Sequence, residues 1–124
     1  MEVIRPQDAK IGPLPFSPAV AAGPYVFVSG QASVDGNGAI VSDDFAGEMR
    51  RSFANVVAIL EAAGLSLSDV VQVRSYVGQQ ADLAEYNRIY AGLFSPPYPA
   101  RTTLIGCLGT LLKFEVDVVA YRGD

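Results

Sequence analysis

The sequence predicts an α+β fold in which two helices cover one face of a single mixed β-sheet. Strand-type and helix-type segments follow one another in the order strand, strand, helix, strand, helix, strand, strand. Each helical segment has one apolar stripe, so both helices can pack on the same sheet face. The length of 124 residues, with 50% hydrophobic and 18% charged residues, fits one folded domain spanning residues 1–124.

The first third of the chain predicts an extended loop followed by a hairpin. Residues 12–24 are rich in Pro, Gly and Ala, which favours an ordered loop. Residues 25–29 form a short apolar run, typical of a strand buried on both faces. The Asp-Gly-Asn-Gly turn at 35–38 allows residues 39–41 to return as the partner strand.

Two amphipathic helices are expected, at residues 45–63 and 82–94. Asp43 and Asp44 precede the first helix as candidate N-caps, and Gly64 is a natural stop. Residues 70–77 between the helices alternate as in a strand. Asn87 falls inside the apolar stripe of the second helix.

The last part of the chain predicts two strands, at residues 102–108 and 112–121. Apolar side chains alternate there with Lys113, Glu115 and Asp117. The sheet face without helices then mixes apolar and polar candidates: Val71, Val73, Thr103, Ile105, Asp117 and Val119. A face of this kind suits a subunit interface with sites built into it.

Composition excludes several classes of function. The chain has no histidine and one cysteine, so we expect no Ser-His-Asp or Cys-His catalysis, no zinc motif and no intrachain disulfide. The net charge of −4 argues against nucleic acid as a partner. Residues 11–34 are uncharged but hold four prolines and three glycines, which excludes a membrane helix. We expect a cytoplasmic protein without membrane contact.

Arg101 is the strongest candidate for chemistry. It directly follows the proline-rich segment 97–100 at the mouth of a strand, and its planar guanidinium has donors that match a carboxylate. Thr103 lies two residues on, on the same side of the strand, and can offer a second contact. Each residue also has a structural explanation. Arg101 can be a solvated strand-end arginine or part of a structural ion pair, and Thr103 can simply reflect the preference of threonine for strands.

Other polar residues have two interpretations each. Asn87 on an apolar stripe can hold a loop or line a pocket. Glu115 and Asp117 share a strand face, where a partly buried carboxylate can activate a water and an exposed one is merely solvated. Ser29 and Gly30 end a strand where the backbone can face a ligand or simply turn. For Cys107, without a histidine partner, we expect a packed core thiol.

Seven segments in register resemble the RidA (YjgF) family of enamine/imine deaminases, over nearly the whole chain. They are Pro-Phe-Ser-Pro-Ala-Val at 15–20, Val-Ser-Gly-Gln at 28–31, Asn-Val, Ile-Leu and Ala-Ala-Gly within 55–64, Asp-Val-Val and Tyr-Val within 69–77, Tyr-Asn with Tyr90 and Phe94 in 86–94, Pro-Ala-Arg-Thr-Thr at 99–103, and Phe-Glu-Val-Asp-Val-Val-Ala at 114–120. The segment at 99–103 is the most diagnostic of them.

The resemblance implies a chorismate-mutase-like fold, a homotrimer with ligand clefts between subunits, and hydrolysis of 2-aminoacrylate-type enamines and imines to 2-oxo acids and ammonia. A small-molecule carboxylate would be the substrate, and no metal or cofactor is implied. Imines are strong electrophiles, so a carboxylate clamp, a positioned water and a proton relay suffice.

Roles for individual residues also follow from the resemblance. Arg101 would grip the substrate carboxylate and Asp117 would hold the water, at a position where active members often carry glutamate. The substrate pocket would be lined by Phe16, Ser29, Gly30, Asn87 and Thr103. Phe16 stands where many members have tyrosine, and Thr103 where cysteine is frequent. Asp117 is one methylene shorter than glutamate.

Three other functions remain open. A non-catalytic trimer that binds a 2-oxo acid would keep the cleft and Arg101. A related deaminase would act on an aminomuconate or 3-aminoacrylate type of substrate. In an interaction or chaperone-like role the sheet face would serve assembly alone, but Arg101 at its motif position favours a carboxylate ligand.

Overall fold

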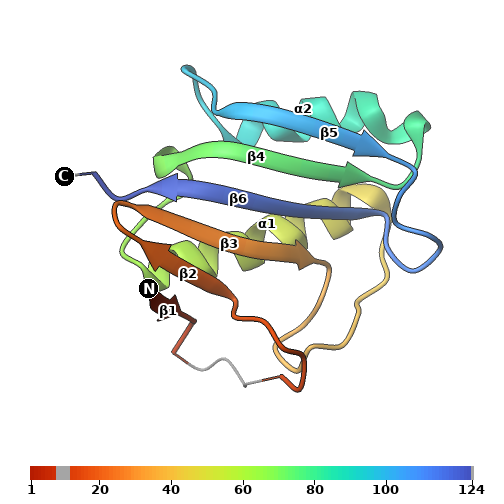
Figure 1. Cartoon of the computed structure of the whole chain (residues 1–124). Helices are drawn as coiled ribbons and strands as arrows, with labels where there is room; N and C mark the ends of the chain where they lie inside the picture. Colours follow the sequence, from red (N-terminus) through yellow and green to blue (C-terminus); the bar gives the residue numbers. More distant parts are fainter. Residues whose placement is uncertain (8–11, 124) are drawn as a thin grey trace.

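The computed structural model describes residues 1–7 and 12–123 and has a six-stranded sheet with the order β1-β2-β3-β6-β4-β5 (Figure 1). The strands are β1 (Glu2–Ile4), β2 (Ala19–Ala22), β3 (Tyr25–Ala32), β4 (Val70–Val77), β5 (Ala100–Ile105) and β6 (Phe114–Tyr121). Neighbouring strands are antiparallel except β4 and β5, which are parallel. The predicted mixed sheet is confirmed, and β5 lies at its edge.

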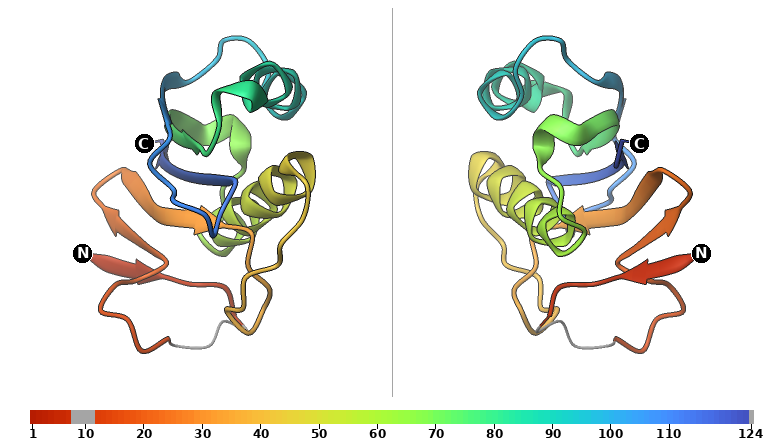
Figure 2. Two further views of the ribbon diagram at one scale, coloured as in Figure 1. Left: turned by 90° about the vertical axis from the view of Figure 1, so that its right-hand side faces the viewer. Right: turned by 90° about the vertical axis from the view of Figure 1, so that its left-hand side faces the viewer.

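Both helices lie on the same side of the sheet, as predicted (Figure 2). They are α1 (Phe45–Ala62) and α2 (Leu83–Leu93). The core between helices and sheet contains Phe53, Tyr86 and Phe114, each at most 1% exposed. Each large apolar side chain buried there contributes roughly 1.5–3 kcal/mol. The opposite face of the sheet is uncovered in the single chain and is called the open face below.

Helix α1 begins and ends where its sequence indicates. The Asp44 side chain accepts a hydrogen bond from the Gly47 amide at 2.8 Å, which satisfies one free N–H of the first turn. At the other end Gly64 has φ +76°, and the Gly64 and Leu65 amides donate to the Glu61 and Leu60 carbonyls. This Schellman arrangement needs a residue that adopts a left-handed conformation without strain.

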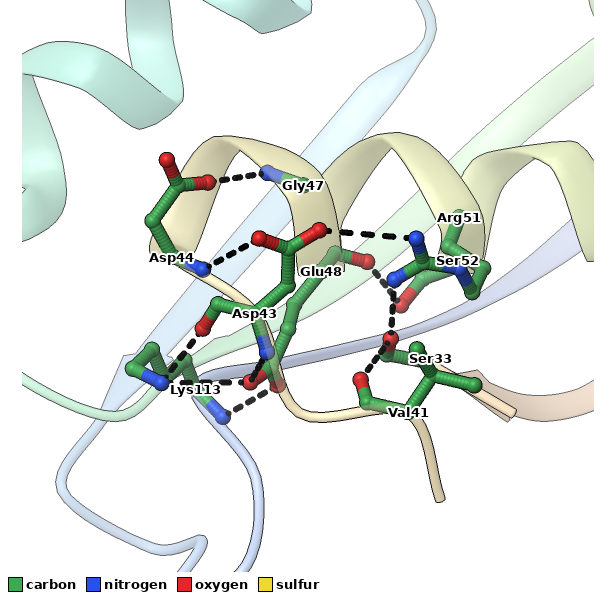
Figure 3. Close-up of polar contacts among 9 residues, drawn as sticks. All are labelled: Ser33, Val41, Asp43, Asp44, Gly47, Glu48, Arg51, Ser52 and Lys113. Atoms are coloured by element: carbon green, nitrogen blue, oxygen red, sulfur yellow. Dashed lines mark hydrogen bonds and ion pairs between the residues drawn. The ribbon is translucent and has the colours of Figure 1, made fainter. Parts of the chain in front are cut away.

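A buried carboxylate ties the start of α1 to the start of β6 (Figure 3). Glu48 is 1% exposed, and its Oε1 accepts from the Lys113 amide at 2.9 Å. Its Oε2 accepts from the Asp43 amide at 3.2 Å and lies 3.3 Å from Lys113 Nζ. Lys113 Nζ also donates to the Asp43 carbonyl. We call Asp43, Glu48 and Lys113 the anchor cluster, because it fixes the entry of β6 against the helix.

The N-terminal third differs from the prediction. Residues 12–24 are not a loop throughout, since β2 pairs there with β3, and β1 adds a further unpredicted strand. Both strands are very short, with Glu-Val-Ile in β1 and Ala-Val-Ala-Ala in β2, so neither is long enough to show the alternation of a strand in the sequence. Conversely, residues 39–41 do not form a strand: only an isolated bridge joins Val34 and Ile40. The following strand is not buried on both faces, because Tyr25 and Phe27 are 42% and 45% exposed.

The composition of the open face also needs correction. Val73 is fully buried on the helix side, and a register shift between Val70 and Gln72 separates it from Val71. Parallel pairing with β4 sets Thr103 beside Ser75 and Ile105 beside Val77, on the helix side as well. Of the expected residues, Val71 is exposed at the register shift, and Asp117 and Val119 alternate with buried residues of β6, so their side chains lie on the open face.

Among the described residues, no helix combines the length and apolar character that crossing a membrane requires.

Candidate functional site

Arg101 lies near the start of the edge strand β5, with its side chain toward α2. Its Nη1 donates to Asn87 Oδ1 at 2.9 Å. The guanidinium carbon lies 4.8 Å from the Tyr90 ring centroid and 5.0 Å from that of Tyr86. No carboxylate within the described residues pairs with Arg101, so its positive charge is not neutralised. The structural ion pair, one of the alternatives for this residue, is therefore absent from the part of the chain described.

A pocket of about 310 Å³ opens beside this guanidinium. Arg101 and Asn87 form its polar wall, and the remaining lining is aromatic or apolar: Tyr90, Ala91, Tyr98 and Pro99. The Asn87 contact occupies one of the five N–H donors of the guanidinium. Enough donors remain for a two-bond contact with a carboxylate. The pocket therefore suits a small anion with an apolar part.

The structure places Asn87 against Arg101 and Thr103 against Tyr86, one of the rings that Arg101 contacts. Asn87 is exposed rather than part of the buried stripe of α2, and its amide oxygen contacts the arginine directly. Thr103 contacts Tyr86, with 3.3 Å between the two hydroxyl oxygens. We call Arg101, Asn87 and Thr103 the arginine half-site.

Glu115 is a partly buried carboxylate of the kind that can activate a water, whereas the family resemblance implied that Asp117 holds the water and the residues alone left the choice open. It is half-buried on the open face, and burial, followed by the charge of Asp117, raises the pKa of its carboxyl group. Gly30 lies in the register shift of β3, and a Cβ there would be 2.6 Å from Glu115 Oε2. Only glycine permits this approach without displacing the carboxylate. The sequence showed Glu115 and Asp117 as two acidic residues on one strand face, but it did not indicate how buried each of the two is.

Asp117, by contrast, is engaged with two neighbours on the open face. Its Oδ1 accepts from Arg74 Nε at 2.8 Å and its Oδ2 accepts from the Tyr76 hydroxyl at 2.7 Å. These hydrogen bonds are the main reason that the pKa of Arg74 and that of Tyr76 are raised. Both carboxylate oxygens of Asp117 thus have partners. We call Glu115, Gly30 and Asp117 the glutamate half-site.

Phe16 and Ser29 lie together at the β2 and β3 side of the sheet. Both line a pocket of about 380 Å³ that also includes Val20 and Phe27 of the open face. The Ser29 hydroxyl donates to the Ser17 carbonyl at 2.6 Å, which holds the preceding segment in place. Phe16 is 64% exposed. Ser29 directly precedes Gly30, so this pocket adjoins the glutamate half-site.

The single chain does not unite the predicted site. The arginine half-site faces α2 at the sheet edge, whereas Glu115 and Asp117 lie on the open face, and β4 separates β5 from β6. The prediction that Cys107 packs in the core is wrong. Cys107 is exposed, because it follows β5 in an irregular segment. Across the described residues, no three His, Cys, Asp or Glu side chains gather as metal ligands would.

Comparisons with known proteins agree with this fold. The family model described as Endoribonuclease L-PSP matches residues 9–122. A RutC family protein of Pyrococcus horikoshii is 37% identical over 123 residues, covering 98% of each chain. The 2-iminobutanoate/2-iminopropanoate deaminase of Salmonella typhimurium is 32% identical over 125 residues, again covering 98% of each.

A solved structure shows the same architecture. The YjgF gene product of Escherichia coli superposes with a TM-score of 0.86 at 30% identity, covering 99% of this chain and 100% of that one. With a family model that spans almost the whole sequence, the chain belongs to the Endoribonuclease L-PSP family, the RidA (YjgF) family.

Proposed function

We propose that the protein hydrolyses 2-imino acids and their enamine tautomers to 2-oxo acids and ammonia. The observation that carries the proposal is the guanidinium of Arg101, which is held beside a pocket without a carboxylate partner among the described residues. The Salmonella relative, whose name specifies an imine deaminase acting on two 2-imino acids, supports the same reaction class.

The complete site is proposed to form between copies of the chain. The two half-sites lie on opposite faces of one sheet, so one chain cannot bring Arg101 to Glu115 without refolding. The open face also exposes large apolar residues that a second copy would cover: Val3, Tyr25, Phe27 and Leu104 are each 42–50% exposed. A homotrimer with clefts between subunits, as expected from the sequence, satisfies both conditions.

The division of labour follows from the surroundings of each group. Arg101 binds the substrate carboxylate through paired N–H donors and orients the imine carbon. Glu115 accepts a proton from water as the water oxygen bonds to the carbon of the protonated imine, whose C=N electron pair moves to nitrogen, which gives a neutral carbinolamine. Glu115 then returns this proton to the amine nitrogen, the C–N bond breaks and ammonia leaves. The hydroxyl proton passes to Glu115 as the C=O bond of the 2-oxo acid forms, and it is lost to solvent before the next turnover. Gly30, Ser29 and Phe16 line the side of the cleft next to Glu115.

Asp117 takes a supporting role in this proposal instead of holding the water. Both of its oxygens accept hydrogen bonds from Arg74 and Tyr76, so we assign the acceptance of a proton from water to Glu115 instead. Its negative charge helps to raise the pKa of Glu115. A carboxylate with a raised pKa is a stronger base toward water than an ordinary surface glutamate.

Other carboxylate ligands fit the arginine half-site as well. An aminomuconate or 3-aminoacrylate type of substrate carries the same anionic group, and a binding protein for 2-oxo acids would need Arg101 but not Glu115. The endoribonuclease activity named in the family description is not proposed, because a net charge of −4 disfavours RNA.

The proposal is tested by timing imine decay. An amino-acid oxidase generates 2-iminobutanoate or a larger imine in situ, and 2-oxo acid release is followed with and without the protein. We expect acceleration by the wild type and loss of most of it in Glu115→Gln. Glu85→Gln, which changes a carboxylate on α2 whose side chain is 42% exposed and pairs with Arg88, is the matched control and should remain active. Equal decay with and without wild-type protein would refute the enzymatic proposal in favour of ligand binding.

A further inference from the structure

Arg101 is supported by two aromatic rings rather than by an acid. Its guanidinium carbon lies 4.8 Å and 5.0 Å from the ring centroids of Tyr90 and Tyr86, inside the range in which a cation is attracted to a ring face. The two ring centroids are 5.7 Å apart, so the rings form one corner around the cation. Tyr86 and Tyr90 are four residues apart on α2, which places both on the same helix face.

The rings are themselves fixed by the core. Tyr86 is fully buried and Tyr90 is 4% exposed. Tyr90 stacks on Phe94 with 4.6 Å between centroids, and Tyr86 lies 5.9 Å from Phe114. The Tyr86 hydroxyl contacts Thr103, two residues along the strand from Arg101. An arginine that is exposed to solvent therefore rests on a surface that belongs to the rigid interior.

An aromatic support differs from an ionic one in its effect on an incoming anion. A carboxylate partner would neutralise the guanidinium and compete with a substrate carboxylate for the same N–H donors. A ring face attracts the cation through its quadrupole and uses none of the N–H donors. Burial raises the pKa of Tyr90 to about 12, so the phenol stays neutral at physiological pH and forms no competing anion pair.

We propose that Tyr86 and Tyr90 are positioning residues for Arg101, which hold its guanidinium in the orientation that binds a substrate carboxylate while leaving its charge unpaired. The inference rests on the proposed function, because it assumes that Arg101 binds a carboxylate. It adds that the geometry of this clamp is set by two core tyrosines of α2 and not by the strand that carries the arginine.

The test measures binding of 2-oxobutanoate, the probe carboxylate, by titration of the intact protein. Tyr90→Leu removes the ring face and should weaken binding about tenfold, as expected for loss of one partly shielded cation–π contact. Tyr90→Phe keeps the face and loses a hydroxyl that has no hydrogen-bond partner among the described residues, so affinity should return to within about twofold of wild type. Phe45→Leu, a buried aromatic of α1, is the matched control for core damage.

A spectroscopic measurement separates positioning from stability, because it reports the surroundings of the Arg101 side chain directly. The Nε–H proton of Arg101, assigned by its disappearance in Arg101→Lys, should resonate upfield of a free arginine because of the ring currents of both tyrosines. In Tyr90→Leu this signal should move downfield, whereas in Phe45→Leu it should stay. A wild-type signal at the position of free arginine would overturn the proposal directly.

The outcomes distinguish the two hypotheses. If wild type binds 2-oxobutanoate, Arg101→Ala does not, and Tyr90→Leu binds as wild type, the positioning role is wrong while the carboxylate clamp stands. The positioning role is equally wrong if Phe45→Leu weakens binding as much as Tyr90→Leu. If wild type fails to bind, or Arg101→Ala binds equally well, the proposed function and the positioning role both fall.

Discussion

Two carboxylates on one strand face illustrate how residue surroundings decide chemistry. Glu115 and Asp117 both lie on the open face of β6, yet Asp117 is held by Arg74 and Tyr76 while Glu115 faces Gly30. Because both oxygens of Asp117 already accept hydrogen bonds, they are less available to a water molecule. A desolvated carboxylate gains basicity. This contrast supports the assignment of Glu115 as the proton acceptor.

The position of Glu115 depends on the absence of a side chain at residue 30. In Gly30→Ala the new Cβ would lie 2.6 Å from Glu115 Oε2, so the carboxylate must move. We expect kcat/KM to fall at least about tenfold, since small displacements of reacting groups are costly. Stability should change by less than about 1 kcal/mol because a flexible side chain can yield. Gly36→Ala, where nothing lies within 4 Å, is the control, and equal activity of the two variants would contradict this role.

The pH dependence of activity should report the protonation of Glu115. Burial and the charge of Asp117 raise the pKa of Glu115, so its basic form appears only above the ordinary glutamate range. Activity should therefore rise with pH along an acidic limb displaced upward from about pH 4.3. Asp117→Asn removes the neighbouring charge, lowers the pKa of Glu115 and should move the limb to lower pH. A limb that stays in place or moves upward in that variant would show that another group titrates.

At the scale of elements, sequence patterns predicted both helices and the mixed sheet because each of those segments is long and periodic. The Asp44 cap and the Gly64 stop have local chemistry that is readable residue by residue. The strand β2 was missed because its four residues show no alternation on their own and form a strand through pairing with both β1 and β3. Val73 and Thr103 were predicted on the wrong face of the sheet for a similar reason. Their orientation depends on a register shift and on parallel pairing, which are set by neighbouring strands.

The candidate site was predictable to the same limited extent. Arg101 and Asn87 of the arginine half-site were predictable, because one belongs to the short motif at 99–103 and the other to the periodic helix α2. The two side chains are hydrogen-bonded in the structure. The choice between Glu115 and Asp117 required knowledge of their cross-strand neighbours. The buried role of Glu48 carried no signal, because a glutamate in the first turn of an exposed helix looks identical in sequence.

The anchor cluster should be necessary for stability at the element scale. Glu48→Gln removes the ion pair with Lys113 and replaces one acceptor oxygen with an NH2 donor, which then faces the backbone N–H of either Lys113 or Asp43. We expect a loss of about 1–3 kcal/mol in the free energy of unfolding, measured by urea denaturation. Glu61→Gln changes an exposed glutamate of the same helix and should cost less than about 0.5 kcal/mol. Similar midpoints for both variants would contradict the anchoring role.

At the scale of the whole molecule, the proposed function requires assembly. The open face displays apolar side chains across the sheet, and the two half-sites meet only if another copy supplies one of them. An apolar patch of this kind on a small protein is typical of a subunit interface.

Phe27→Asp is expected to prevent assembly. The side chain is 45% exposed in the chain, so the charge should disturb the monomer fold little while opposing burial in an interface. Sedimentation velocity should give a trimer for wild type and a monomer for the variant, which should lose imine hydrolysis. Ile40→Asp, equally exposed but outside the sheet strands, should remain trimeric and active. A fully active Phe27→Asp monomer would disprove a site shared between subunits.

The central claim, that Arg101 grips the carboxylate of a 2-imino acid, is tested most directly by the kcat/KM of Arg101→Ala for imine hydrolysis. Two charge-assisted hydrogen bonds at roughly 1.5–3 kcal/mol each predict a loss on the order of a thousandfold. Arg101→Lys should recover only part of the rate, because it restores the charge without the planar fork. Wild-type acceleration that disappears in Arg101→Ala, with assembly unchanged, is the predicted result. An alanine variant that hydrolyses the imine as fast as wild type would contradict the claim.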